Sequence, residues 1–334
     1  MTGGFDKFAN SAAKKKGTAE VDSAFLAEIE GWRETLAKNI ALRNKEKIQS
    51  EADLNYAVQM TIDRMIFLRI CEDRGYESEY QLQELSKREN VYDELKKLFE
   101  KADRRYNSGL FHFPAGRRAK DEKGRGRADT FTTGLEIDDK VLKDILKDLY
   151  YPAPYVFALI PADILGQIYE QFLGKVIRLT AGGNAKVEEK PEVRKAGGVY
   201  YTPTFIVDTI VGNTIGKLVE SREQRVVTPA EVAKLKILDP ACGSGTFLLG
   251  AYQYLLDWHL NWYLNNDFEK WSKGKNAVIV QSNPARFKSA GGVRGRDGWK
   301  LTVEKKKEIL LNNIHGVDID PQAVEVTKLS LLLK

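Results

Sequence analysis

The chain has 334 residues, and 52 Lys and Arg against 47 Asp and Glu give it a formal net charge of +5. This length allows two domains with real cores, while no apolar run reaches a membrane span and the first 17 residues lack the apolar centre of a secretory signal. The two cysteines and three scattered histidines form no disulfide framework and no metal-ligand motif, so we expect no metal and a reducing, cytoplasmic location.

The first half of the chain has the apolar spacing of helices. Residues 1–20 are polar and lysine-rich, which predicts a flexible arm. Residues 21–180 predict an all-helical domain, with helices from 21, over 51–73, near 79–88 and 91–103, and over 138–151 and 161–179. We expect their apolar stripes to form core. Residues 181–198, rich in Gly, Glu and Lys, predict a linker.

Residues 199–334 alternate between strand and helix patterns. We expect a helix from near 203 to 219, a short strand over 235–238, a glycine turn and an aromatic helix to about 264. A basic, glycine-rich insertion follows over 265–300, then a helix over 303–313, a second short strand from 314 and a final helix over 322–333. The inner side of the first helix is predicted to carry Ile206, Ile210, Val211, Ile215 and Leu218.

The turn after the first strand is the most specific feature of the sequence. It has the order Asp239-Pro240-Ala241-Cys242-Gly243-Ser244-Gly245-Thr246-Phe247. Glycines allow a ligand to approach the backbone, and ligands of open α/β sheets bind beyond the carboxyl ends of strands. Leu248 stands where a dinucleotide fingerprint has its third glycine, so that motif is excluded.

A second acidic turn follows the second strand. Asp318 lies at its end, 73 positions after Gly245, so the crossover carries a long insertion. A carboxylate at this place can accept hydrogen bonds from ribose hydroxyls. Asp320 precedes Pro321, which indicates that Asp320 begins the last helix.

A third element is the string Gly198-Val199-Tyr200-Tyr201-Thr202-Pro203. Thr-Pro at a helix start offers a hydroxyl and amide groups that suit the carboxylate of an amino acid. The simpler interpretation is a helix cap, made by Thr202 or Thr204.

In this order, the three elements resemble the S-adenosyl-L-methionine (AdoMet) binding half of γ-class N6-adenine DNA methyltransferases. The run 309–326 and the run 163–170 look like the type IIG restriction–modification and phage-defence group. The resemblance implies a Rossmann-like class I methyltransferase sheet that begins in residues 199–334 and is cut before the family's catalytic motif. With the helical domain before it, the expected fold class is α + α/β.

The resemblance also implies the roles of the site residues. Tyr201 and Thr202 would lie at the methionine carboxylate, and Asp318 would hold the ribose hydroxyls. The loop would hold the methionine amino group and close over AdoMet, through Asp239, Pro240, Ala241, Gly243 and Gly245.

The family's catalytic motif, Asn/Asp-Pro-Pro-Tyr/Phe, does not occur in the sequence. The one Asn-Pro is Asn283-Pro284, inside the basic insertion, and we assign it no catalysis. We therefore assign no catalytic residue and expect this segment alone to be inactive.

The expected function is site-specific methylation of adenine N6 in double-stranded DNA, within a restriction–modification or defence enzyme whose specificity or nuclease parts are supplied elsewhere. The basic stretches 101–130, with nine Lys and Arg, and 270–307, with eleven, suit a phosphate backbone or are solvated surface. Two alternatives stay open: a methyltransferase of the same fold acting on RNA or protein, and a non-catalytic DNA-binding or assembly module with a vestigial cofactor fold.

Overall fold

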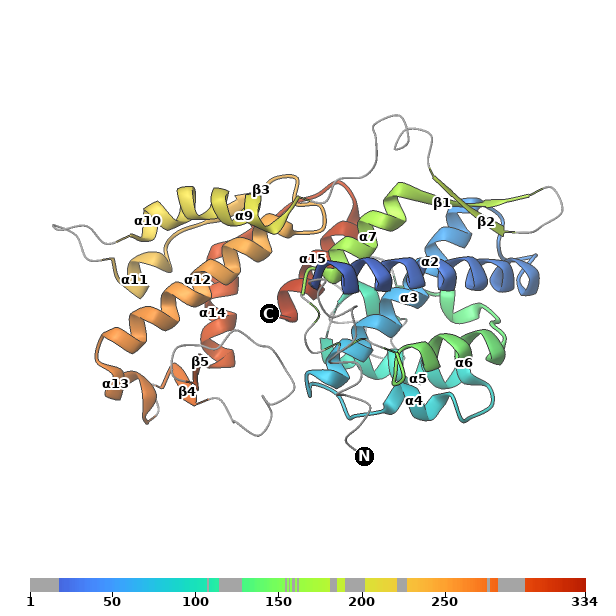
Figure 1. The fold of residues 1–334 in the computed structure, drawn as a ribbon, viewed down its shortest axis with the longest axis horizontal. Coiled ribbons are helices and arrows are strands. Elements are labelled where there is room, and N and C mark those ends of the chain that lie inside the picture. Colours follow the sequence, from blue (N-terminus) through green and yellow to red (C-terminus); the bar gives the residue numbers. More distant parts are fainter. Residues whose placement is uncertain are drawn as a thin grey trace. The chain divides into compact units, whose positions relative to one another are not determined.

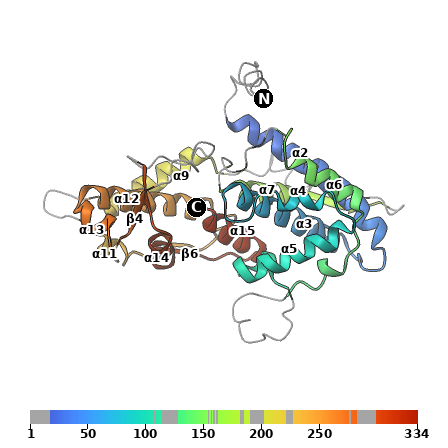
Figure 2. The same cartoon turned by 90° about the horizontal axis from the view of Figure 1, so that it is seen from below.

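The computed structural model describes residues 18–106, 108–113, 128–153, 155, 157, 160, 162–180, 185–189, 202–220, 227–274, 277–281 and 298–334. Figures 1 and 2 show these elements from two directions. The chain forms two compact units. The first contains residues 1–107, 111–160 and 175–190, and the second contains residues 108–110, 161–174 and 191–334.

The N-terminal unit is built on two long helices, α2 (Thr18–Arg43) and α3 (Glu51–Asp73). Ser50 caps α3 by accepting a hydrogen bond from the amide of Asp53 at 3.1 Å. The shorter helices α4 (Gln81–Leu85), α5 (Val91–Tyr106) and α6 (Asp139–Asp148) pack with them, and a 3-10 turn lies at Thr132–Gly134. Another 3-10 turn, Gly109–Phe111, has its first two residues in the second unit. The apolar stripes predicted for α2 and α3 are buried, including Phe25, Leu36, Ile40, Leu54, Val58, Ile62 and Ile66.

One predicted helix ends earlier than expected. The pattern over 161–179 forms α7 (Ile164–Gly174) and then a strand, β1 (Lys175–Leu179). Strand β1 pairs antiparallel with β2 (Ala185–Glu189), which lies within the predicted linker. The strand forms because residues 175–179 pair with residues 185–189, and the β-branched Val176 and Ile177 suit an extended backbone.

The contacts of α7 also differ from the predicted domain organisation. The sequence predicts this helix as the last part of the helical domain, whereas its contacts group it with the C-terminal unit. There it packs against α15 (Pro321–Leu332). This placement brings α7 to the acidic turns described below.

The C-terminal unit contains a parallel pair of strands, β3 (Ile237–Asp239) and β6 (Ile314–Gly316). In this pair Asp239 stands opposite Gly316, so both strands end at the same edge. Helices α12 (Thr246–Asn265) and α14 (Val303–Asn313) connect them. The insertion between these helices contains α13 (Phe268–Ser272) and an antiparallel hairpin of β4 (Ile279–Gln281) and β5 (Trp299–Leu301).

The helix expected over 203–219 is present as α9 (Thr204–Val211), a π-turn over Gly212–Gly216 and α10 (Lys217–Val219). Its predicted inner face is partly wrong, because Ile206, Ile210 and Leu218 are exposed. The buried stripe consists of Val207, Val211, Ile215 and Val219. The stripe is rotated because α9 packs on α12 at Gly250, where a Cβ would come within 2.5 Å of Val207.

The predicted aromatic helix α12 belongs to the core of this unit, with Tyr252 and Tyr263 buried. The Tyr252 hydroxyl donates to the carbonyl of Lys306 at 3.0 Å, and the Trp258 indole donates to the carbonyl of Val219 at 3.1 Å. A four-residue helix, α11 (Pro229–Val232), begins at Thr228 with a full capping box. None of the helices in the described part of the chain is both long and apolar enough to cross a membrane.

Candidate cofactor site

The turn after β3 has a left-handed backbone at two positions, and both are glycines. Gly243 has φ +51° and Gly245 has φ +86°, a region that costs other residues energy. The carboxylate of Asp239 accepts a hydrogen bond from the Ala241 amide at 3.1 Å, and the Gly245 amide donates to the Cys242 carbonyl at 2.8 Å. Helix α12 begins directly afterwards, so the predicted strand, turn and helix are confirmed.

The turn after β6 lies against this glycine turn. The Cys242 amide donates to the Val317 carbonyl at 2.9 Å, and the Val317 amide donates to the Asp239 carbonyl at 2.9 Å. Asp318 then accepts a hydrogen bond from the Gly243 amide at 2.8 Å. The structure thus joins two acidic turns that are more than seventy residues apart in the sequence.

Asp318 is held in its charged form. Its Oδ1 accepts from the Asp320 amide at 2.9 Å and its Oδ2 accepts from the Gly243 amide. These backbone hydrogen bonds, from Asp320 first and Gly243 second, hold the pKa of the Asp318 carboxyl below its ordinary value. Asp320 caps α15 by accepting from the Gln322 amide at 2.8 Å, as the sequence predicts.

The residues present fit a nucleoside cofactor at this edge. A carboxylate has about four acceptor sites, so the backbone donors, from Asp320, Gly243 and Ile319, do not exhaust the capacity of Asp318 to accept from a ribose hydroxyl. A Cβ built on Gly243 would meet no atom within 4 Å, so the backbone is open on that side. Pro240 and Ala241 are exposed in the same turn. Gly245 instead faces Thr327 of α15, whose hydroxyl donates to the Gly243 carbonyl at 2.9 Å.

The structure does not bring Thr202 into this arrangement. Pro203 precedes α9 without a side-chain cap, so the expected cap from Thr202 or Thr204 is wrong. In the described residues no hydrogen bond joins Thr202 to the glycine turn, and its role stays a prediction. Tyr201 lies outside the described residues, as do residues 198–200 and the Asn283-Pro284 pair.

Helix α7 contributes contacts that the sequence analysis did not predict. The Ser244 hydroxyl donates to Glu170 at 2.7 Å, and the Tyr169 hydroxyl donates to Asp320. The run 163–170 resembles the family in sequence, but its periodicity predicts only core. The sequence signal for these contacts is the adjacent pair Tyr169 and Glu170, which places a hydroxyl and a carboxyl in the middle of a mostly apolar helix.

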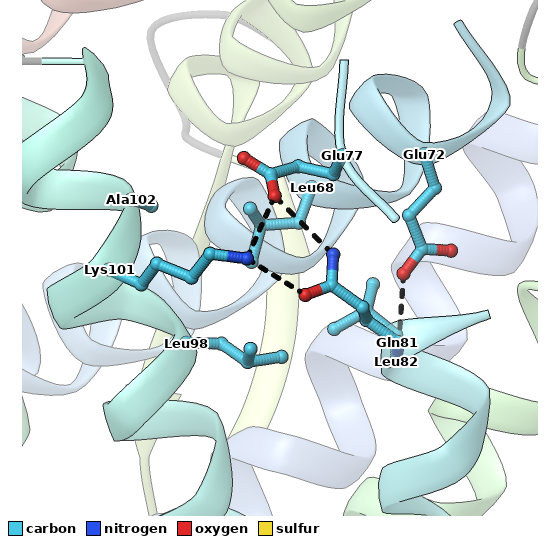
Figure 3. A pocket seen from close by; sticks show the side chains of 8 residues that line it. All are labelled: Leu68, Glu72, Glu77, Gln81, Leu82, Leu98, Lys101 and Ala102. Carbon is cyan, nitrogen blue, oxygen red and sulfur yellow. Dashed lines mark hydrogen bonds and ion pairs between the residues drawn. The ribbon is translucent and has the colours of Figure 1, made fainter. Parts of the chain in front are cut away.

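The cavities of the N-terminal unit lie elsewhere. Figure 3 shows one that is lined in part by Glu77, Gln81 and Lys101, in which Lys101 Nζ lies 3.3 Å from Glu77 and 3.2 Å from Gln81. Its volume is about 10 Å³, so it holds one water at most. A second cavity of about 310 Å³ has an acidic lining that includes Asp93 and Asp138. Neither contains a predicted site residue.

Comparison with known proteins agrees with this geometry. Residues 161–272 match the N-6 DNA methylase family, and residues 218–334 match the DNA-methyltransferase domain of MmeI. The first match includes α7, the helix that contacts both acidic turns.

Three relatives are similar over large parts of the chain. A type II restriction enzyme and methyltransferase of Escherichia coli is 32% identical over 100% of this chain and 29% of its own length. The adenine-specific methyltransferase BrxX of Escherichia coli is 25% identical over 51% of this chain and 13% of its own. The methylase subunit of a type I restriction enzyme from Methanocaldococcus jannaschii is 25% identical over 57% of this chain and 35% of its own.

The chain thus spans about a third or less of the length of these relatives. The predicted resemblance to the methyltransferases of restriction–modification and defence systems is confirmed. Residues 161–334 are therefore similar to the DNA methyltransferase domains of N-6 DNA methylases, as found in restriction–modification enzymes.

Proposed function

We propose that this chain binds AdoMet at the edge formed by β3 and β6, as the first part of a Rossmann-like sheet, and serves the methylation of adenine N6 in duplex DNA. The observation that carries the proposal is the hydrogen bond from the Gly243 amide to Asp318. It joins the glycine turn to an ionised carboxylate at the tips of two parallel strands, where nucleoside cofactors bind in open α/β sheets.

The two acids have different roles in the proposal. Asp318 accepts the ribose hydroxyls, and Asp239 with the backbone of the glycine turn holds the methionine amino group. AdoMet supplies the activated methyl group. The chain's own contribution is to bind the cofactor and to fix its orientation, since the family's amine-accepting Asn/Asp-Pro-Pro-Tyr/Phe string is absent from its sequence.

Isothermal titration of the 334-residue chain with AdoMet tests the cofactor site. We expect saturable binding that weakens by about tenfold to a hundredfold in Asp318→Ala and Asp239→Ala, since a hydrogen bond to a charged group contributes about 1.5–3 kcal/mol. Asp208→Ala is the matched control, because Asp208 is an exposed aspartate of the same unit, on α9. Unchanged affinity in both site variants would contradict the assignment.

A second assay tests the reaction. The chain is incubated with AdoMet labelled in its methyl group and with adenine-containing duplex DNA. We expect binding without transfer, because the proposal places the amine-accepting motif, and the DNA specificity or nuclease parts, on a segment or subunit other than these residues. Methyl label in the DNA would refute the expectation that this chain alone does not transfer the methyl group. Label in RNA or in protein would favour the alternative substrates.

A further inference from the structure

We propose that helix α7 fixes the two acidic turns before the cofactor binds, with Glu170 and Tyr169 as positioning residues. This inference rests on the proposed AdoMet site and names how its geometry is set. Two consecutive side chains of one helix contact two different turns, which come from the ends of two different strands.

The first contact fixes the glycine turn. Ser244 lies between the left-handed Gly243 and Gly245 and is 3% exposed. Its hydroxyl donates to Glu170 Oε1 at 2.7 Å. One helical turn earlier, a Cβ built on Gly166 would come within 2.9 Å of the Ser244 Cβ. Positions 166 and 170 share a face of α7, so Ser244 is held by close packing and by a hydrogen bond together.

The second contact positions Asp318, the proposed ribose-binding carboxylate, through Asp320. Tyr169 is 2% exposed, and its hydroxyl donates to Asp320 Oδ2. The Asp320 amide in turn donates to Asp318 at 2.9 Å. Burial, and then the Asp320 carboxylate, raise the pKa of Tyr169, so the phenol stays a donor. Tyr169 thereby fixes the residue that orients Asp318.

Apolar side chains also attach α7 to its unit. The helix buries Leu165 and Ile168, and α15, which it contacts, buries Ala323 and Val326. These apolar side chains provide the adhesion. The hydrogen bonds orient the turns, because each of them holds one side chain of a turn in place.

Glu170 has a feature that a purely stabilising residue would lack. Its Oε2 atom is buried without a hydrogen-bond partner among the described residues. Burial also raises the pKa of its carboxyl, against the opposing effect of the Ser244 hydrogen bond. An incompletely paired carboxyl costs stability, and an apolar side chain would fill the place at lower cost. A positioning role for the Ser244 hydroxyl explains why a carboxyl stands here.

The consequence is a preorganised site. A turn with two left-handed residues would sample other conformations if it were free, and ordering it on binding would weaken the affinity. Because the contacts with α7 already order the turn in the folded chain, the binding of AdoMet does not have to order it. AdoMet affinity should therefore depend on two side chains that belong to neither predicted cofactor motif.

The test uses the 334-residue chain and two measurements. Hydrogen–deuterium exchange of the amides of 242–246 and 318–322 in the free chain tests the positioning role. Titration with AdoMet tests its effect on binding. We expect Glu170→Ala to speed exchange in 242–246, and Tyr169→Phe to speed it in 318–322. Each variant should weaken AdoMet binding by about tenfold, equivalent to one lost hydrogen bond of about 1.4 kcal/mol.

Glu170→Gln is the conservative rescue. Its amide oxygen still accepts the Ser244 hydroxyl, so exchange and affinity should stay near the wild-type values. Ser244→Ala removes the same bond from the other side, and the double variant with Glu170→Ala should be no worse than either single variant. Glu269→Ala is the control, because that side chain is 86% exposed in the same unit.

Unchanged exchange of 242–246 in both Glu170→Ala and Ser244→Ala would overturn the inference, as would a Glu170→Gln variant as fast as Glu170→Ala. If Glu170→Ala does not fold, Ser244→Ala and Glu170→Gln decide alone. A wild-type chain that fails to bind AdoMet would refute the proposed function. The exchange measurement, made without cofactor, would still decide whether α7 positions the turns.

Discussion

Replacement of Gly245 by alanine should destabilise the C-terminal unit by about 2–5 kcal/mol, the sum of two costs. An L-residue in the left-handed region costs about 1–2 kcal/mol, and Gly245 has φ +86° and ψ 17°. The new Cβ would also lie 2.5 Å from Cγ2 and 2.6 Å from Oγ1 of Thr327, and overpacking of this kind costs about 1–3 kcal/mol. Thr327 cannot yield easily, because it is 4% exposed and its hydroxyl donates to the Gly243 carbonyl.

Gly243 provides the matched comparison in the same turn. Its φ is +51°, but a Cβ there would meet no atom within 4 Å. Gly243→Ala should therefore cost only the conformational part, about 1–2 kcal/mol. The difference between the two variants isolates the collision with Thr327, at about 1–3 kcal/mol.

Urea unfolding followed by tryptophan fluorescence measures these costs. Four of the five tryptophans, at positions 258, 262, 271 and 299, belong to the C-terminal unit, so the signal reports mainly on the unit that changes. The Thr327→Ala background is the control. It removes both colliding atoms, so Gly245→Ala should cost less there than in the wild type. Equal destabilisation by Gly243→Ala and Gly245→Ala, with no relief in the Thr327→Ala background, would refute the reasoning.

Two further predictions concern buried charge. His259 is 1% exposed, and burial lowers its pKa to about 4. Because the unfolded state binds a proton near pH 6.5 and the folded state does not, stability is full above about pH 6.5 and falls by about 3 kcal/mol as the pH drops to about 4. Urea midpoints at pH 7.5 and 4.5 should show this fall in the wild type and a smaller one in His259→Gln. In the N-terminal unit, Arg64 lies 2.6 Å from Asp129, with side chains 1% and 3% exposed. Arg64→Met should cost about 3–5 kcal/mol, because it leaves a buried carboxylate without its partner. Far-ultraviolet circular dichroism during thermal unfolding measures this loss, and a cost below about 1 kcal/mol would show that Asp129 does not depend on the pair.

Short-range patterns determined much of the architecture. Phe25, Leu36 and Ile40 on one helix, and Leu54 and Ile62 on the next, lie at helical spacing and are buried as expected. Local signals of this kind involve residues only a few positions apart, so the sequence contains them directly.

Short-range patterns also predict the strand, the glycine turn and the helix cap at the candidate site. The order of apolar run, Asp239, glycine turn and helix, and the Pro321 that follows Asp320, predicted a strand, a turn and a helix cap that the structure confirms. These features depend on backbone preferences of glycine and proline and on capping, all of which act over a few residues.

Only the tertiary structure decided which faces meet. The stripe of α9 is rotated toward Val207 because α12 offers a close approach at Gly250, and no pattern within α9 specifies that partner. The run Lys175–Leu179 became a strand because residues 185–189 pair with it. Above all, Glu170 reaches Ser244 across 74 positions and Tyr169 reaches Asp320 across 151. Periodicity places these side chains on a helix, but contacts at such separations depend on packing between elements, which a one-dimensional pattern does not contain.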